Sequence, residues 1–172
     1  RLEKDKHGNK NYLNSSKPII FIVDRRDRGI KVIDRAEGMD EKDLKKNFGV
    51  YGSDKSGWSK GYHVRGLFGQ GIEDVLYYHK NGLVKSIKKN IAYSCKFYWS
   101  QNERYIDPQK LGFANKKIRK EWGIKRGNGT VVEFILDKYT NPLGREKLVK
   151  NLTSFYMLRF INADRKRCMK LI

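Results

Sequence analysis

Three glycines, Gly66, Gly69 and Gly71, stand close together in the segment GLFGQGIEDV, directly before a run rich in apolar and acidic residues. Glycine lets a backbone approach another group closely, and the free amides at the start of a helix bind phosphate. Lys55 and Arg65 precede the segment and add positive charge. The segment therefore predicts an anion-binding turn, with an ordinary glycine turn into a core helix as the alternative.

The spacing of these glycines excludes two common phosphate-binding loops. A Walker A loop ends in Gly-Lys-Ser or Gly-Lys-Thr, because its lysine and hydroxyl hold the phosphates and magnesium, and this chain has no such ending. A Rossmann loop follows a strand directly, whereas these glycines follow residues 49–65, which are polar and lack apolar periodicity. We interpret residues 49–65 as a functional loop, because long loops without regular structure are uncommon in compact domains and are often lids.

Two further polar residues stand at the ends of predicted strands. Asp34 ends the segment IKVID, and a tight turn at Gly38 and Met39 follows it; Thr130 begins TVVEFIL after the turn GNG. A carboxylate at a strand end is usually a turn residue, but it can also accept a hydrogen bond from an amine in a pocket. The Thr130 hydroxyl could face the same pocket, or the residue could be an ordinary β-branched strand residue.

Hydrophobic patterning predicts the elements that position these residues. The expected strands are residues 18–23, 30–34, 82–88, 91–99 and 130–136. The expected helices begin after the cap residue Asp40, run from Gln70 to about His79, and span residues 141–160. Asp40 is the expected N-cap of the first helix, and Gly49 its C-terminal stop. Residues 100–128 show no clear element. This order predicts an α+β fold: a two-layer sandwich whose mixed, mainly antiparallel sheet is covered on one face by helices.

Taken in order, these segments resemble the ATP-binding domain of the gyrase, heat-shock chaperone, histidine kinase and MutL (GHKL) superfamily, known as the Bergerat fold. The family pattern is Asp-x-Gly-x-Gly, a lid, Gly-x-x-Gly-x-Gly and a later Gly-Thr. Here these motifs correspond to residues 34–38, 49–65, 66–71 and 129–130, and the resemblance covers residues 18–137.

The resemblance implies an ATPase domain that binds ATP and Mg²⁺ and acts as a conformational switch, often as a homodimer. It favours the MutL-like and chaperone-like branches, because none of the three histidines has the helical setting of a phosphoacceptor. The implied domain layout is a tail at residues 1–17, the ATP-binding domain at 18–137, and a helix at 138–172 that leads to a following domain.

The resemblance also implies a role for each matching residue. Asp34 would accept a hydrogen bond from the adenine amino group, with Thr130 beside it through water, and Gly38 would leave room for the base. The other implied nucleotide-binding residues are Met39 against the base, Asn47 near the nucleotide, Ser53 and Lys55 in the lid, and Gly66, Phe68, Gly69, Gln70 and Gly71 around the phosphates.

Two features depart from the family pattern. Ala36 replaces the first glycine of Asp-x-Gly-x-Gly. The family's Glu-x-x-x-Asn helix, whose glutamate activates water and whose asparagine ligates magnesium, has no match before Asp34. Residues 1–17 are interpreted as the last turn of that helix and a loop. No catalytic residue or metal ligand is assigned, because Glu3 and Glu73 are expected to face solvent.

Composition adds a second class of function. The 172 residues carry a formal net charge of +19, which favours a polyanionic partner. The alternative function is therefore a basic nucleic-acid-binding module, with DNA or another polyanion as partner, in which the nucleotide site is degenerate or secondary. In that module the aromatic residues Tyr93, Phe97, Tyr98 and Trp99 could stack on bases, or they could fill the core of the sheet.

Cysteine content and hydropathy indicate the cellular location that we expect for the chain. Two cysteines without a CxxC motif do not form a disulfide framework, and no apolar run is long enough to cross a bilayer. These features favour an intracellular protein, cytoplasmic or nuclear, without a structural zinc site.

Overall fold

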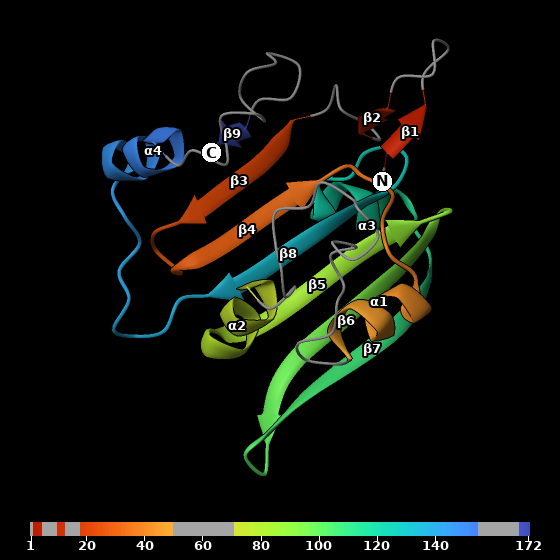
Figure 1. Cartoon of the computed structure of the whole chain (residues 1–172), viewed down its shortest axis with the longest axis horizontal. Coiled ribbons are helices and arrows are strands. Elements are labelled where there is room, and N and C mark those ends of the chain that lie inside the picture. Colours follow the sequence, from red (N-terminus) through yellow and green to blue (C-terminus); the bar gives the residue numbers. More distant parts are fainter. Residues whose placement is uncertain (1, 5–9, 13–17, 50–70, 155–168) are drawn as a thin grey trace.

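The computed structural model describes residues 2–4, 10–12, 18–49, 71–154 and 169–172. Its centre is a seven-stranded sheet in the order β7-β6-β5-β8-β4-β3-β9 (Figure 1). The strands are β3 (Ile19–Asp24), β4 (Gly29–Asp34), β5 (Lys80–Lys88), β6 (Ile91–Ser100), β7 (Glu103–Phe113), β8 (Gly129–Ile135) and β9 (Met169–Leu171). All neighbours pair antiparallel except β3 and β9, which are parallel. The predicted α+β fold with a mixed, mainly antiparallel sheet is confirmed.

The hairpins of this sheet depend on residues that tolerate positive φ. Lys89 and Asn90, with φ of 49° and 64°, connect β5 to β6, as the sequence predicts for this turn. Gln101 and Asn102, with φ of 49° and 63°, connect β6 to β7 in the same way. Two consecutive positive φ values match the twist of a two-residue hairpin. The segment 100–128, where the sequence pattern shows no clear element, contains β7 and the helix α3 (Lys116–Trp122).

Helices α1 (Glu41–Phe48) and α2 (Gly71–Tyr78) pack on one face of the sheet, the face toward the viewer in Figure 1. The buried residues of this layer are Leu44, Phe48, Leu76, Tyr77, Val84, Cys95 and Phe97. Asp40 caps α1 and forms a capping box with Asp43, and Gly49 is its C-cap, as predicted. The two helices cover this face as the sequence leads us to expect.

Helix α3 packs on the opposite face of the sheet. Its Trp122 lies in a second buried cluster with Ile33 and Ile87, which alternate with the residues that face α1 and α2. Gly123, with φ of 72°, ends α3 in the left-handed conformation. The fourth helix, α4 (Arg145–Ser154), follows β8 within the predicted helical segment 141–160.

Two local features differ from the sequence expectations or refine them. Residues 2–4 and 10–12 form the strands β1 and β2 of a small antiparallel sheet, where the end of a helix was expected. Phe97 is buried, but Tyr98 and Trp99 are about half exposed, so only part of the aromatic β6 segment fills the core. In the described part of the chain, no helix has the length and hydropathy needed to span a membrane.

The buried thiol of Cys95 gives a test of the packing between β6 and the helices. Burial raises the pKa of Cys95 to about 12, so the reactive thiolate is scarce at neutral pH. We expect iodoacetamide to leave Cys95 unmodified in the folded protein and to alkylate it after unfolding. Mass spectrometry of the peptide that contains Cys95 measures this directly. Rapid alkylation of that peptide under native conditions would contradict the described packing.

Candidate functional site

One row of residues crosses the three central strands at the end of β4. Backbone pairing places Asp34 of β4 opposite Thr130 of β8, and Thr130 opposite Ser86 of β5. Directly paired residues point to the same face of a sheet, and this row lies on the face covered by α1 and α2. The structure therefore brings together Asp34 and Thr130, as predicted, and adds Ser86.

Asp34 is a partly buried carboxylate held in a defined orientation. Its Oδ1 accepts a hydrogen bond from the Ala36 backbone N–H at 2.9 Å. Burial raises the pKa of Asp34, although hydrogen bonds from the Ala36 and Thr130 backbones oppose this shift. Asp34 forms no ion pair with any residue that the structure describes. An acceptor of this kind, removed from water and lacking a cation, is suited to a donor group on a ligand.

Ala36 is compatible with the turn after Asp34. Its φ is not positive, so the backbone at this position does not require glycine. The hydrogen bond from its N–H to Asp34 forms with a methyl side chain present. The departure from the family pattern at Ala36 therefore leaves the local geometry of the Asp34 turn intact.

Ser86 is the residue of this site that sequence reasoning missed. Its side chain is fully buried, and its Oγ accepts a hydrogen bond from the Met39 N–H at 2.6 Å and donates one to the Gly129 carbonyl at 3.2 Å. A single hydroxyl thus joins the turn after β4 to the start of β8. The signal in the sequence is a serine that shares a strand face with the apolar Val84.

Two glycines allow the backbones of the site to approach closely. Gly38 has a φ of 70°, and a Cβ atom there would lie 2.1 Å from the Ile87 carbonyl oxygen. A Cβ atom on Gly129 would lie 2.5 Å from the Asp34 carbonyl oxygen. A side chain at either position would clash with backbone. The structure thus gives Gly38 a packing reason, its close approach to β5, whereas its implied role of leaving room for the base stays a prediction.

Met39 and Asn47 lie next to each other at the edge of this site. The Asn47 Nδ2 lies 3.4 Å from the Met39 Sδ and donates a weak hydrogen bond to it. Met39 also packs against the buried cluster beneath α1 and α2. Both residues are partly buried, so each combines a structural contact with access to the surface beside the Gly38 turn.

A charged group fixes the start of α1 beside the site. The Lys88 Nζ lies 2.8 Å from Asp40 Oδ2 and also contacts Asp43. The hydrogen bond from Lys88 lowers the pKa of Asp40, and the hydrogen bond to Asp40 raises the pKa of Lys88. Since Lys88 follows Ser86 on β5, this strand anchors both the Gly38 turn and the N-cap of α1.

The remaining predicted nucleotide-binding residues are Ser53, Lys55, Gly66, Phe68, Gly69 and Gln70, which lie outside the described residues. Gly71 is described: it is exposed and is the first residue of α2. The expectation that Glu73 faces solvent is wrong. Glu73 is only 1% exposed, and it lies on the same side of α2 as the buried Leu76 and Tyr77. Across the described ranges, no group of three or more His, Cys, Asp or Glu residues could hold a metal ion.

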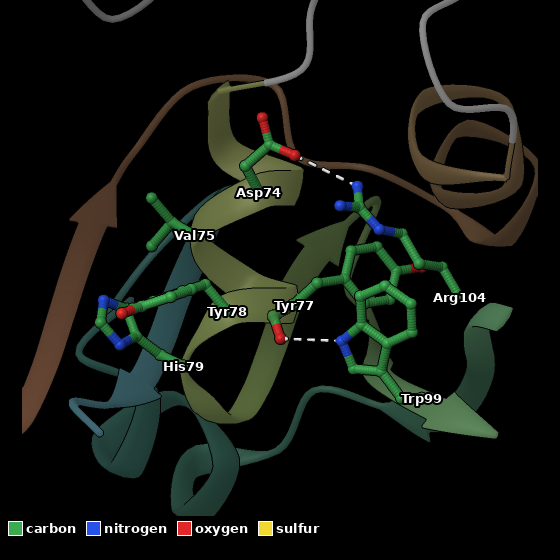
Figure 2. Close-up of a pocket in the computed structure, with 7 residues that line it drawn as sticks. All are labelled: Asp74, Val75, Tyr77, Tyr78, His79, Trp99 and Arg104. Atoms are coloured by element: carbon green, nitrogen blue, oxygen red, sulfur yellow. Dashed lines mark hydrogen bonds and ion pairs between the residues drawn. The ribbon is translucent and has the colours of Figure 1, made fainter. Parts of the chain in front are cut away.

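A pocket of about 510 Å³ lies at the other end of the sheet, between the end of α2 and the β6–β7 hairpin (Figure 2). It is lined by Asp74, Val75, Tyr77, Tyr78, His79, Trp99 and Arg104, none of which was predicted to bind nucleotide. The Arg104 guanidinium lies 5.1 Å from the Tyr77 and Trp99 ring centroids and 3.1 Å from Asp74 Oδ1. The Trp99 Nε1 donates to the Tyr77 carbonyl at 3.0 Å. These contacts hold the hairpin against α2, so we assign them a structural role.

Substitution of Gly38 tests the close approach of the turn to β5. We expect Gly38→Ala to lower the free energy of unfolding by about 2–4 kcal/mol, because strain at positive φ adds to overpacking. Gly127→Ala is the matched control: its φ is also 70°, but no atom lies within 4 Å of its Cβ position. We expect the control to cost only about 1–2 kcal/mol. Equal losses in urea denaturation would show that the contact with Ile87 is unimportant.

Comparison with known proteins identifies the fold. No protein-family model matches the chain, and no curated protein matches it. Among solved structures, the chain is similar to the ATPase and transducer domains of DNA topoisomerase II from Balamuthia mandrillaris, with a TM-score of 0.61 and 11% sequence identity. The match covers 99% of this chain and 52% of that one, so the chain spans about half its length. At this identity the similarity shows the fold and does not distinguish the MutL-like or chaperone-like branches. The chain therefore shares the α+β fold of these ATPase and transducer domains.

Proposed function

We propose that this chain is an ATP-binding domain of the GHKL type that acts as an ATP-driven switch within a larger intracellular protein. The observation that carries the proposal is the row formed by Asp34, Thr130 and Ser86 beside the Gly38 turn. A partly buried carboxylate without an ion pair among the described residues lies next to a turn that excludes a side chain. The fold, which resembles that of an ATPase domain, supports this interpretation.

The chemistry of Asp34 favours adenine over guanine. An ionised carboxylate only accepts hydrogen bonds, and the adenine amino group donates them. Guanine carries a carbonyl oxygen at the same ring position, which would repel the Asp34 oxygen. Thr130 would add a hydroxyl beside Asp34, and Met39 would pack on the base. The site should therefore prefer ATP to GTP.

The phosphate end of the nucleotide would lie toward the start of α2. Gly71 is exposed there, and the amides of a helix N-terminus favour anions. Residues 49–65 would form the lid and residues 66–70 the remaining phosphate contacts. When bound, Mg²⁺ would neutralise phosphate charge. The described residues do not form a magnesium site by themselves, so we derive no hydrolysis step from them.

The match to half of a two-domain structure supports a larger architecture. In this proposal residues 18–137 bind ATP, and residues 138–172 connect the domain to a following one. An ATP-ordered lid would change a dimer or domain interface, because a ligand shifts an equilibrium by binding one state more tightly than the other.

Replacement of Asp34 tests the nucleotide site. We expect Asp34→Asn to weaken Mg-ATP binding by about 10- to 100-fold, since a hydrogen bond to a charged group contributes about 1.5–3 kcal/mol. Isothermal titration calorimetry on the complete protein measures the affinity. Asp27→Asn, in the exposed β3–β4 turn, is the control and should bind normally. Absence of Mg-ATP binding by the unsubstituted protein would overturn the proposal.

The same variant makes a prediction about pH and stability. Because the folded-state pKa of Asp34 is raised, its ionisation opposes folding as pH rises from the ordinary aspartate pKa through the folded-state pKa. Asp34→Asn should therefore be at least as stable as the unsubstituted protein near neutral pH. Its advantage should shrink below about pH 4, where the carboxyl is protonated in both states. Urea denaturation at the two pH values measures the difference. A variant that is markedly less stable at neutral pH would show that the Asp34 charge stabilises the fold.

A further inference from the structure

A dense group of exposed basic side chains surrounds α3, near the β5–β6 turn. Residues 109–128 contain seven basic residues and one acidic residue, Glu121. The exposed basic residues of this region and of the adjoining turn are Lys89, Lys110, Lys116, Lys117, Lys120, Lys125 and Arg126. We call these seven side chains the α3 basic surface.

Tertiary contacts bring the three segments of this surface together. The Ala114 N–H, just before α3, donates to the Asn90 carbonyl in the β5–β6 turn at 2.8 Å. The Lys89 N–H of that turn donates to Asn128 Oδ1 at 3.0 Å. The β5–β6 turn therefore lies between the start of α3 and the loop that leads into β8.

Arg119 connects the same three segments through hydrogen bonds of its guanidinium group. Its guanidinium donates to Asn90 Oδ1 at 2.9 Å, to the Gly127 carbonyl at 2.9 Å and to the Ala114 carbonyl at 3.0 Å. Arg119 is only partly exposed, and its donors serve the fold. The surface is thus a fixed arrangement, and we do not count Arg119 among the side chains that face a partner.

The charges of the α3 basic surface are not neutralised by neighbouring acids. None of the seven forms an ion pair with another described residue. The acidic residue of the segment, Glu121, lies 3.7 Å from Lys85 Nζ, on the face of the sheet against which α3 packs. Lys117 and Lys120, three residues apart on α3, repel each other and weaken the helix slightly. A folded surface that keeps such repulsion is suited to an anionic partner.

We propose that the α3 basic surface binds the sugar–phosphate backbone of nucleic acid. Closely spaced lysines match a chain that carries a charge at every phosphate, and binding would release counterions from it. Phe113 and Leu111, which are 69% and 47% exposed, lie beside Lys110 and Lys116 in the sequence and offer apolar contact to sugars or unpaired bases. Recognition through phosphates does not read the sequence of the bases.

This binding does not depend on nucleotide at Asp34. The α3 basic surface and the proposed nucleotide site are nevertheless connected through one loop. Asn128 contacts Lys89, and Thr130, two residues further on, lies in the row with Asp34 and Ser86. Because the α3 basic surface and the row at Asp34 have no side chain in common, loss of ATP binding and loss of nucleic-acid binding can be measured as separate results.

The test compares two triple variants of the full chain that lose the same charge. Lys116→Ala/Lys117→Ala/Lys120→Ala removes three lysines from α3, and Arg145→Ala/Lys147→Ala/Lys150→Ala removes three exposed basic residues from α4. Fluorescence anisotropy with labelled duplex DNA and labelled single strands, each over a range of salt concentrations, measures the affinity. We expect the α3 variant to bind about tenfold or more weakly, with its salt slope reduced by about 2–3, and the α4 variant to bind within about twofold of the unsubstituted protein.

Additional experiments distinguish the phosphates of nucleic acid from those of lipids and test whether the variants remain folded. If a base stacks on the Phe113 ring, Phe113→Ala should weaken the binding of single strands more than that of duplex. If the variant weakens both equally, the contact is with the sugar–phosphate backbone alone. Both results support the proposal. The single variants Lys120→Ala and Lys125→Ala, checked by circular dichroism, should each reduce the salt slope by about 1. Equal losses in the two triple variants, no binding at low salt, or tighter binding to phosphatidylserine vesicles than to nucleic acid would overturn the proposal.

Discussion

The backbone pairing of β8 with both of its neighbours is the constraint on which the site depends. Its register sets Thr130 between Asp34 and Ser86, on the face that α1 and α2 cover. Because side chains alternate along a strand, a slip by one residue would turn Thr130 away and bring Val131 into its place. The same pairing buries Val131 in the opposite cluster, so the apolar core on one face fixes the polar row on the other.

Contacts made by β5 near Ser86 connect the central strands to the turn that precedes α1 and to the start of α1. The Ser86 hydroxyl bonds the Met39 N–H, and Gly38 lets the turn lie against β5 without a side chain. Lys88, two residues further on, contacts the Asp40 cap of α1. The position of Asn47 on α1 is thus linked to β5 through hydrogen bonds and through the cap. Candidate binding residues in this part of the molecule are also packing residues.

The strong positive charge of the chain is distributed in two different ways. On the face of the sheet against which α3 packs, Lys31 and Lys85 lie 3.6 Å and 2.5 Å from the carboxylate of Glu133, so these charges belong to an internal network. Around α3 the lysines project outward without such acids among the described residues. Net charge by itself does not separate these two uses, since only the paired strands place Glu133 beside both lysines.

Much of this protein follows from local sequence pattern. The hairpins around 25–28 and 89–90, the capped helix after Asp40 and the strand that begins near Thr130 follow from turn residues, capping residues and apolar alternation, which act over a few positions. The ordered motifs around Asp34 and Gly129 also predict the fold that the chain shares with the topoisomerase II ATPase and transducer domains. The extent of β7, the burial of Glu73 and the role of Ser86 could not be predicted in this way. They depend on which strands become neighbours and which face each side chain takes, and those are long-range choices that only the packed sheet decides.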